Sequence, residues 1–164
     1  MEKSVLADQF SAALKEAVQE LAETMLSREI IPGDGQFSPL EQPVDFSAVV
    51  SYSGAIQGSL CLSGPAKSVL ALASTLIGEE RPYMDPDLED SFSEICNIIG
   101  GGVQTRMEPT LGSISMSPPV VVSGHNHAVV ARDEQHACVS QLFSMDGQTF
   151  FTEIFYKCDE PASS

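Results

Sequence analysis

A carboxylate and a side-chain amide stand three residues apart in the segment 93–102, SEICNIIGGG, just before three consecutive glycines. Glu94 can pair with a cation. Asn97 can donate and accept hydrogen bonds at the same time and carries no charge at any relevant pH. Two interpretations are open at this point. The pair is either a functional site or part of a solvated helix face that ends at the glycines, because polar pairs at this spacing are common on exposed faces.

The residues around this pair have the spacing of an amphipathic helix. At 3.6 residues per turn, one face of a helix over 88–106 collects Phe92, Ile95, Cys96, Ile99 and Val103, which would face a core. The opposite face collects Asp90, Glu94, Asn97 and Gly101. We therefore expect Glu94 and Asn97 to project side by side into solvent, as far from the core as the helix allows.

The glycines at 100–102 allow two interpretations. A glycine inside a helix costs about 1 kcal/mol relative to alanine, so the helix could end at Gly100, with glycine as its C-terminal cap. Alternatively, the helix continues through VQTRM, since Val103 stays in phase with the apolar stripe. A continuous helix would then carry a bare patch that lets the backbone of a partner come close.

The first third of the chain contains the signals of one helix, one loop and one hairpin. Apolar residues recur every three or four positions over about 5–26, which predicts an amphipathic helix. A Pro/Gly-rich loop is expected over 32–43. Apolar and small or polar residues alternate over 44–54 and 55–64, which predicts two adjacent strands in a hairpin.

Two more helices are predicted by their end signals. Gly-Pro at 64–65 begins a helix with proline at its first position, and Gly78 ends it. Asp-Pro-Asp at 85–87 opens the helix that carries the polar pair, because aspartate can cap free amides and proline suits a first helical turn.

The last third of the chain turns to strand patterns. Strands are expected over 113–124, 127–132, 136–145 and 148–157. Asp-Gly at 146–147 predicts a tight hairpin between the last two. We expect residues 1–164 to form a single α/β (α+β) domain with a largely antiparallel sheet covered by long helices. Its core would span about 5–158, and 159–164 would be a loose tail.

The charge balance excludes several classes of partner. The chain has 8 Lys+Arg against 23 Asp+Glu, a formal net charge of −15. Such a surface repels phosphate backbones and anionic lipid, so we expect neither nucleic acid nor a membrane as a partner. The N-terminal residues lack a signal-peptide pattern, and the four cysteines form no CxxC pair. A cytoplasmic protein with reduced, mostly buried thiols is predicted.

Other chemistry has weaker support. His125 and His127 make an incomplete set of metal ligands, so no metal site is predicted. His136 opens a predicted strand and is interpreted as structural. The glycines at 100–102 follow an amphipathic helix and not a strand, and no GKS or GKT sequence is present, which argues against a small-molecule phosphate site.

Asp90, Glu94, Asn97 and Pro119, at their spacing in this chain, resemble the signature of the CheC/CheX/FliY phosphatases of bacterial chemotaxis. The surroundings are similar to CheX proteins. The similar segments are ETMLSREI, VVSYSGAIQGSLCLSGP, ASTLIGEE, EICNIIGGGVQTRM and SMSPPVVVSG. The resemblance covers about residues 5–158 and favours a functional site over a plain solvated helix face.

The resemblance implies a protein phosphatase that acts on the phospho-aspartate of a CheY-type response regulator. The regulator brings an acidic pocket, Mg²⁺ and a lysine, so the phosphatase needs no cofactor of its own. Asn97 would orient the attacking water, and Glu94 would pair with the regulator's lysine. Gly101 and Gly102 would let the regulator seat closely. Asp90 matches an outer position of the motif, but a first-turn helix charge explains it equally well.

The same resemblance implies a homodimer, as in CheX proteins. It also implies one site per chain, because CheC-type relatives carry two such helices and the first helix here has no E-x-x-N. It also leaves an alternative open. The middle domain of the flagellar switch protein FliM shares the fold but is a structural part. A non-catalytic module that binds a response regulator or a flagellar-switch component is therefore the second interpretation. Pro119 also matches an outer position of the motif, and a strand-edge or loop proline explains it equally well.

Overall fold

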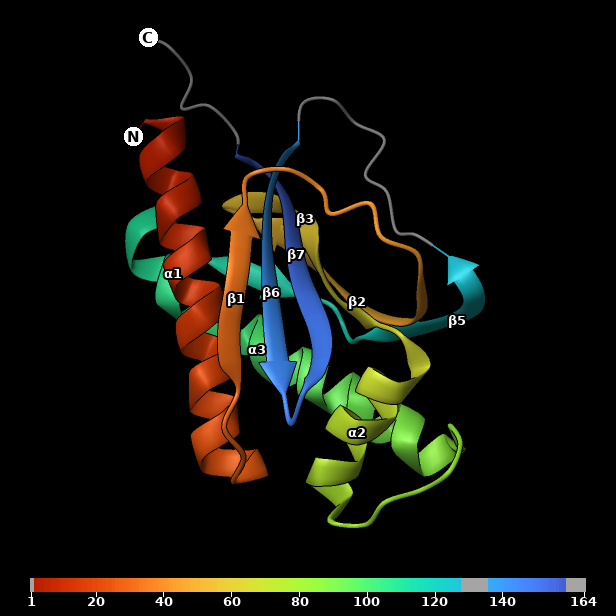
Figure 1. The fold of residues 1–164 in the computed structure, drawn as a ribbon. Coiled ribbons are helices and arrows are strands. Elements are labelled where there is room, and N and C mark those ends of the chain that lie inside the picture. The colour runs from red at the N-terminus through yellow and green to blue at the C-terminus, as the bar shows by residue number, and fades with distance from the viewer. Residues whose placement is uncertain (1, 128–135, 159–164) are drawn as a thin grey trace, which may run out of the picture.

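The computed structural model describes residues 2–127 and 136–158, and the backbone alone at 125 and 126. Within these residues, seven strands form one antiparallel sheet in the order β1-β6-β7-β3-β2-β4, with β5 beside β2 (Figure 1). The strands are β1 Ile31–Gln36, β2 Val44–Gly54, β3 Ile56–Gly64, β4 Ile114–Met116, β5 Val120–His127, β6 Ala137–Met145 and β7 Gln148–Cys158. The expected α+β fold with a largely antiparallel sheet is confirmed.

Three long helices complete the core. They are α1 Lys3–Leu21, α2 Ala66–Ile77 and α3 Pro86–Leu111. A five-residue π-helix, Ala22–Leu26, continues α1 and ends at Ser27, whose φ of 51° is left-handed. The helical segment predicted over 5–26 is therefore confirmed. Phe10 of α1 lies with its ring centroid 4.3 Å from that of Tyr156 in β7, which packs this helix directly against the sheet.

The predicted helix ends are close to the observed ones. Gly78 ends α2 in the left-handed region with a φ of 81°. Pro65, predicted as the first helical residue, is the N-cap of α2, so the helix begins one position later than predicted, at Ala66. At the start of α3, the backbone amide of Leu88 donates to Asp85 Oδ1 at 2.9 Å, as expected for a capping aspartate.

The prediction of a loop over the whole of 32–43 is wrong. Its first half belongs to β1, an edge strand that pairs with β6. All six residues of β1 are exposed and two are glycines, so neither alternation nor β-branched residues marked the strand in the sequence. Backbone pairing and the side-chain amide of Gln141, which donates to Gly33 O at 2.8 Å, hold it in place. The loop proper is 37–43.

The strand predicted over 113–124 is divided in two. Residues 117–119, Ser-Pro-Pro, separate β4 from β5, because proline cannot donate to a ladder. Both strands pair with β2, at 52–54 and at 44–49. The strand predicted over 127–132 falls mostly on 128–135, outside the described residues. The predicted β6–β7 hairpin is confirmed at the Asp-Gly turn, where both residues have positive φ.

The cysteines of the described chain are free, and Cys61, Cys96 and Cys138 are buried. Burial raises the pKa of the Cys96 thiol to about 12, so this sulfur stays protonated and unreactive at neutral pH. Within residues 2–127 and 136–158, none of the helices combines the length and the low charge that a bilayer span demands.

The loop 37–43 crosses the face of the sheet opposite the helices and is fastened there by a buried carboxylate. Glu153 of β7 is only 4% exposed. Its Oε2 accepts from the backbone amide of Leu40 at 3.0 Å and lies 3.0 Å from Ser140 Oγ. The same Ser140 hydroxyl lies 2.6 Å from Ser38 O. Since a hydroxyl has one proton for these two acceptors, a protonated Glu153 fits this cluster best.

This arrangement predicts a pH dependence of stability. Burial raises the pKa of Glu153, and the nearby Glu41 acts in the same direction, against the Leu40 amide and Ser140. A raised folded pKa means that the folded protein binds the proton more tightly, so stability is highest below the unfolded pKa and falls as pH rises through the folded value. We expect urea unfolding between pH 4.5 and 8 to show this fall in the wild type and a smaller one in Glu153→Gln. Parallel pH curves for the two proteins would contradict this account.

Candidate active site on helix α3

Helix α3 runs through the three glycines without a break over 26 residues. The alternative that the helix ends at Gly100 is therefore wrong, and the helix continues five residues beyond the predicted 106. Its apolar stripe is buried as predicted, from Leu88 through Phe92, Ile95, Ile99 and Val103. Since the rise is about 1.5 Å per residue, the helix is about 39 Å long.

At Gly100, α3 packs closely against the sheet. A Cβ at this position would meet Met116 Sδ at 2.8 Å and Val50 Cγ2 at 2.9 Å, so a side chain there would push the helix away. The hydroxyl of Tyr52 in β2 donates to Gly100 O at 2.7 Å and supplements the helical hydrogen bonds. Burial raises the pKa of Tyr52 far above its ordinary value, so it remains a donor. This glycine is required for packing.

Gly102 is also explained by packing within the chain. A Cβ at this position would meet Ala17 Cβ of α1 at 2.9 Å. Arg106, one turn further along α3, pairs with Glu16 and Glu20 of α1 at 3.3 and 2.6 Å, and holds the two helices together. Gly102 therefore does not lie beside the polar pair. The structure shows a packing reason for this glycine, the close contact between α1 and α3, and the role in partner seating that the resemblance implied for it stays a prediction.

Of the three glycines at 100–102, only Gly101 has no close neighbour. A Cβ built at Gly101 has no neighbour within 4 Å, although the residue lies on the same helix face as Glu94 and Asn97. The expected smooth patch on the polar face is thus one residue wide. Among the described residues, none comes close enough to require glycine at this position, and the role in partner seating that the resemblance implied for Gly101 stays a prediction.

These environments predict opposite effects of two adjacent substitutions. Gly101→Ala should stabilise the protein by about 1 kcal/mol, because alanine is the better helix former and meets no neighbour. Gly102→Ala gains the same propensity but overpacks the contact with Ala17, which costs about 1–3 kcal/mol. Chemical denaturation of both variants tests this. Equal stabilities would mean that the contact between α1 and α3 adapts without cost.

An open hollow of about 560 Å³ lies along the N-terminal half of α3. Its lining residues are Asp90, Ser93, Glu94, Asn97, Met116, Ser117, Pro118 and Pro119. The hollow thus brings together all four residues of the sequence motif, although Pro119 comes from the segment between β4 and β5. Sequence analysis did not identify the neighbouring Met116, Ser117 and Pro118 as parts of the site. The Ser-Pro-Pro break before a strand was their one signal.

The lining residues outside α3, residues 116–119, form a second wall of the hollow and change the exposure of the Asn97 amide. Asp90 and Glu94 are exposed, but Asn97 is half-buried because Met116 and Pro119 line the same hollow. The expectation that Asn97 lies as far from the core as the helix allows is corrected accordingly. Among the described residues, none forms a hydrogen bond or an ion pair with the side chains of Glu94 or Asn97. Both groups are free to bind a partner.

Hydrogen bonds hold the second wall, and strand β4 before it, against the helix and the sheet. The Gln104 amide on α3 donates to Ile114 O at 2.5 Å, and the Ile114 amide donates to Glu108 Oε2 on the same helix at 3.1 Å. The Ser117 amide donates to Ser51 O, and the Ser51 amide donates to Ser117 Oγ, both at 2.9 Å. The position of Asn97 relative to this wall is therefore set before any partner binds.

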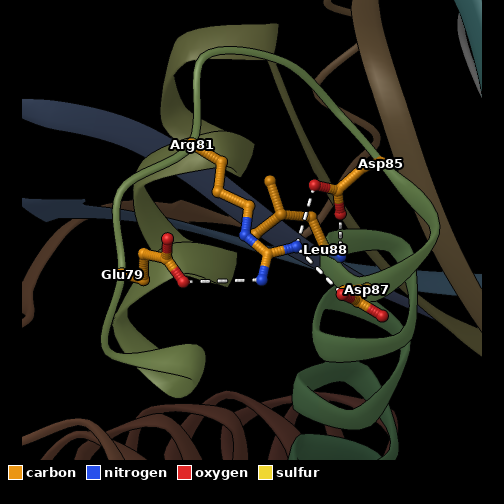
Figure 2. A network of polar contacts seen from close by, with 5 residues as sticks. All are labelled: Glu79, Arg81, Asp85, Asp87 and Leu88. Atoms are coloured by element: carbon orange, nitrogen blue, oxygen red, sulfur yellow. Dashed lines mark hydrogen bonds and ion pairs between the residues drawn. The ribbon is translucent and has the colours of Figure 1, made fainter.

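A second polar cluster lies at the N-terminal end of α3, where the α2–α3 loop arrives (Figure 2). Arg81 Nη1 pairs with Asp85 Oδ2 at 2.8 Å and with Asp87 Oδ2 at 3.0 Å, and Nη2 lies 3.6 Å from Glu79 Oε2. The Leu88 amide, followed by Arg81, lowers the pKa of Asp85, so this cap stays ionised. Sequence analysis did not identify this cluster.

His127, one of the two histidines considered as metal ligands, makes hydrogen bonds within the chain. The Nδ1 of His127 donates to Gly124 O at 2.6 Å, and its Nε2 lies 3.0 Å from Ser47 Oγ. The side chain of His125 lies outside the described residues. In the described part of the chain, no group of three or more His, Cys, Asp and Glu residues could hold a metal ion.

The comparison with known families decides the membership of this chain. A family model described as "Chemotaxis phosphatase CheX" matches residues 46–144, which hold the β2–β3 hairpin, α2, α3 and both walls of the hollow. The chain belongs to the CheX family. The resemblance noted in the sequence is thereby confirmed.

The sequence identity to an individual CheX relative is low. The CheY-P phosphatase CheX of Thermotoga maritima is 28% identical over 90 residues, which are 54% of this chain and 58% of that protein. The match therefore spans a little over half of the length of each.

Solved structures share the whole fold. CheX from Vibrio vulnificus superposes with a TM-score of 0.80 at 24% identity, over 90% of this chain and 99% of that one. The CheX of a CheX–CheY–BeF₃–Mg²⁺ complex from Borrelia burgdorferi gives 0.72 at 22%, over 92% and 96%.

Proposed function

We propose that this protein dephosphorylates the phospho-aspartate of a CheY-type response regulator, with Asn97 as the residue that orients the attacking water. The observation that carries the proposal is the state of the Asn97 amide. It is half-buried in an open hollow, beside the exposed Glu94, and free of hydrogen bonds to the described chain. A polar group held rigidly without an internal partner is suited to bind atoms that another molecule supplies.

The chemistry assigned to the amide is positioning. Phosphoryl transfer needs little covalent help from a protein, because the regulator supplies the acidic pocket, the Mg²⁺ and the lysine that stabilise the phosphoryl group. Asn97 Oδ1 accepts a hydrogen bond from a water and orients it in line with the scissile P–O bond. Water attacks phosphorus, the aspartate carboxylate leaves, and inorganic phosphate is the second product. The amide itself neither gains nor loses a proton.

Glu94 is assigned to docking. It lies one helical turn before Asn97 on the same face, so both side chains enter the regulator's pocket together. Its carboxylate pairs with the regulator's active-site lysine and gains strength as both groups lose water. The exposed Asp90, one turn further back, adds a second negative charge along the approach. The protein needs no cofactor of its own in this scheme, and a homodimer remains a prediction from the resemblance.

Asn97→Ala tests the catalytic role. Loss of the amide should reduce stimulated dephosphorylation by at least about a hundredfold, since misplacement of the attacking group by 1 Å costs that much. Affinity for the regulator treated with BeF₃⁻ and Mg²⁺ should be retained. The measurement is loss of labelled phosphate from a purified phosphorylated regulator. Gln19→Ala, which removes an exposed amide from α1, is the matched control and should have wild-type activity.

Asn97→Asp sharpens this test, because it keeps the size of the side chain but places a negative charge beside the phosphoryl group. It should be inactive as well. Full activity in either variant would remove the amide from the mechanism.

Glu94→Ala tests the docking role. Removal of a charge that pairs across an interface should weaken binding of the BeF₃⁻-treated regulator by about tenfold or more, and more than Asn97→Ala does. Asp8→Ala removes an exposed carboxylate from α1 and controls for the change in net charge. If both substitutions weaken binding equally, the effect is long-range repulsion and not a pairing at Glu94.

A non-catalytic binding module is the alternative function. It would grip a response regulator or a flagellar-switch component through the same face of α3, without hydrolysis. In that case the wild-type protein binds the regulator but its phosphate is lost at the unstimulated rate.

A further inference from the structure

An exposed tyrosine stands at the N-terminal end of α3, outside the hollow. Tyr83, in the loop that joins α2 to α3, has 69% of its surface exposed, and the neighbouring Pro82 and Pro86 are also exposed. Single exposed apolar residues are common on soluble proteins, so exposure alone says little. What distinguishes Tyr83 is the order of the loop that carries it and its position relative to Asp90, Glu94 and Asn97.

The loop is fixed from both sides. Arg81 lies inside it and reaches Glu79 behind and Asp85 and Asp87 ahead, so one guanidinium joins the end of α2 to the start of α3 (Figure 2). Met84, in the same loop, packs against the hydrophobic core. A side chain on a loop that is already ordered loses little conformational freedom on binding, which favours Tyr83 as a contact.

The size of an interface brings the loop into reach of the partner. A stable complex covers about 800 Å² on each protein, equivalent to a patch about 30 Å across. Such a patch centred on Glu94 extends about ten residues along α3 in either direction, at 1.5 Å per residue. Asp85 is the N-cap of the helix, and Tyr83 precedes it by two residues. A regulator seated over the hollow therefore reaches the edge of the loop at about residue 84, next in sequence to Tyr83.

The charges on this end of the helix are partly paired. In a chain of net charge −15, the single positive charge of Arg81 is shared by the carboxylates of Glu79, Asp85 and Asp87 and neutralises them only in part. Asp90 and Glu94 keep their charges unpaired among the described residues. The helix face is thus divided into a partly neutralised end with an aromatic ring and an acidic stretch that attracts a lysine.

We infer that the α2–α3 loop, residues 79–85, is a second contact surface for the response regulator, with Tyr83 as its aromatic anchor and Arg81 as the residue that positions it. This inference rests on the proposed function. Aromatic residues are enriched among the contacts that dominate binding energy. The loop would contribute affinity, while the chemistry stays at Asn97.

The experiment compares Tyr83→Ala, Tyr83→Phe and Phe37→Ala with the wild type. Phe37, 60% exposed, lies in the loop on the opposite face of the sheet and is the matched control. The Kd for the regulator treated with BeF₃⁻ and Mg²⁺ and the KM and kcat for the phosphorylated regulator are measured. Tyr83→Ala should raise Kd and KM about tenfold with kcat unchanged. Tyr83→Phe and Phe37→Ala should match the wild type.

Arg81→Ala, in the wild-type and Tyr83→Ala backgrounds, separates positioning from direct contact. Loss of Arg81 should raise Kd several-fold when Tyr83 is present and have little further effect when it is absent, because the two residues act as one unit. If Arg81→Ala unfolds, the pair Tyr83→Ala and Tyr83→Phe still decides the question.

Three results would overturn the inference. They are wild-type affinity in Tyr83→Ala, an equal loss in Phe37→Ala, or a fall in kcat at constant KM. Asn97→Ala distinguishes this failure from that of the proposed function, since lost turnover with retained binding supports the function whatever Tyr83 does. A wild-type protein that does not bind the regulator overturns both.

Discussion

The close contact between α3 and the sheet at Gly100 is the constraint on which the site depends. Because this residue has no side chain, the helix lies against Val50 and Met116, and the Tyr52 hydroxyl bonds directly to the helix backbone. The same contact sets how deep Asn97 lies beside the wall of residues 116–119. A helix displaced from the sheet would still present the amide, but at a different height from that wall. Packing beneath the helix therefore determines geometry on its outer face.

The sequence predicted the parts of the structure that depend on periodicity. The spacing of Phe92, Ile95 and Ile99 identified the buried stripe of α3, and the opposite face followed from it. Alternation identified the β2–β3 hairpin, the Asp-Gly turn identified the β6–β7 hairpin, and the Asp-Pro-Asp signal identified the cap at Asp85. The edge strand β1 was missed because its pairing uses backbone groups, and its exposed side chains carry no alternation.

Properties that depend on a neighbouring element could not be predicted from one helix. A helical wheel places Asn97 and Glu94 on the same face, but the half-burial of Asn97 comes from residues 116–119, which are remote in the sequence. The glycines show the same limit. Three identical residues in a row face the sheet, open solvent and α1 in turn, and only tertiary packing distinguishes Gly101 from Gly102.

The unbroken length of α3 has a consequence for how the site tolerates change. Gln104 and Glu108 hold β4 from the C-terminal half of the helix, while the amide of Asn97 lies two to three turns earlier on the same rigid element. A helix hardly stretches or bends over so short a span. Small displacements at a position that no partner touches are therefore transmitted to the amide almost undiminished. In directed evolution of this protein, substitutions along α3 that are remote from the site should alter turnover as readily as those at the contact surface.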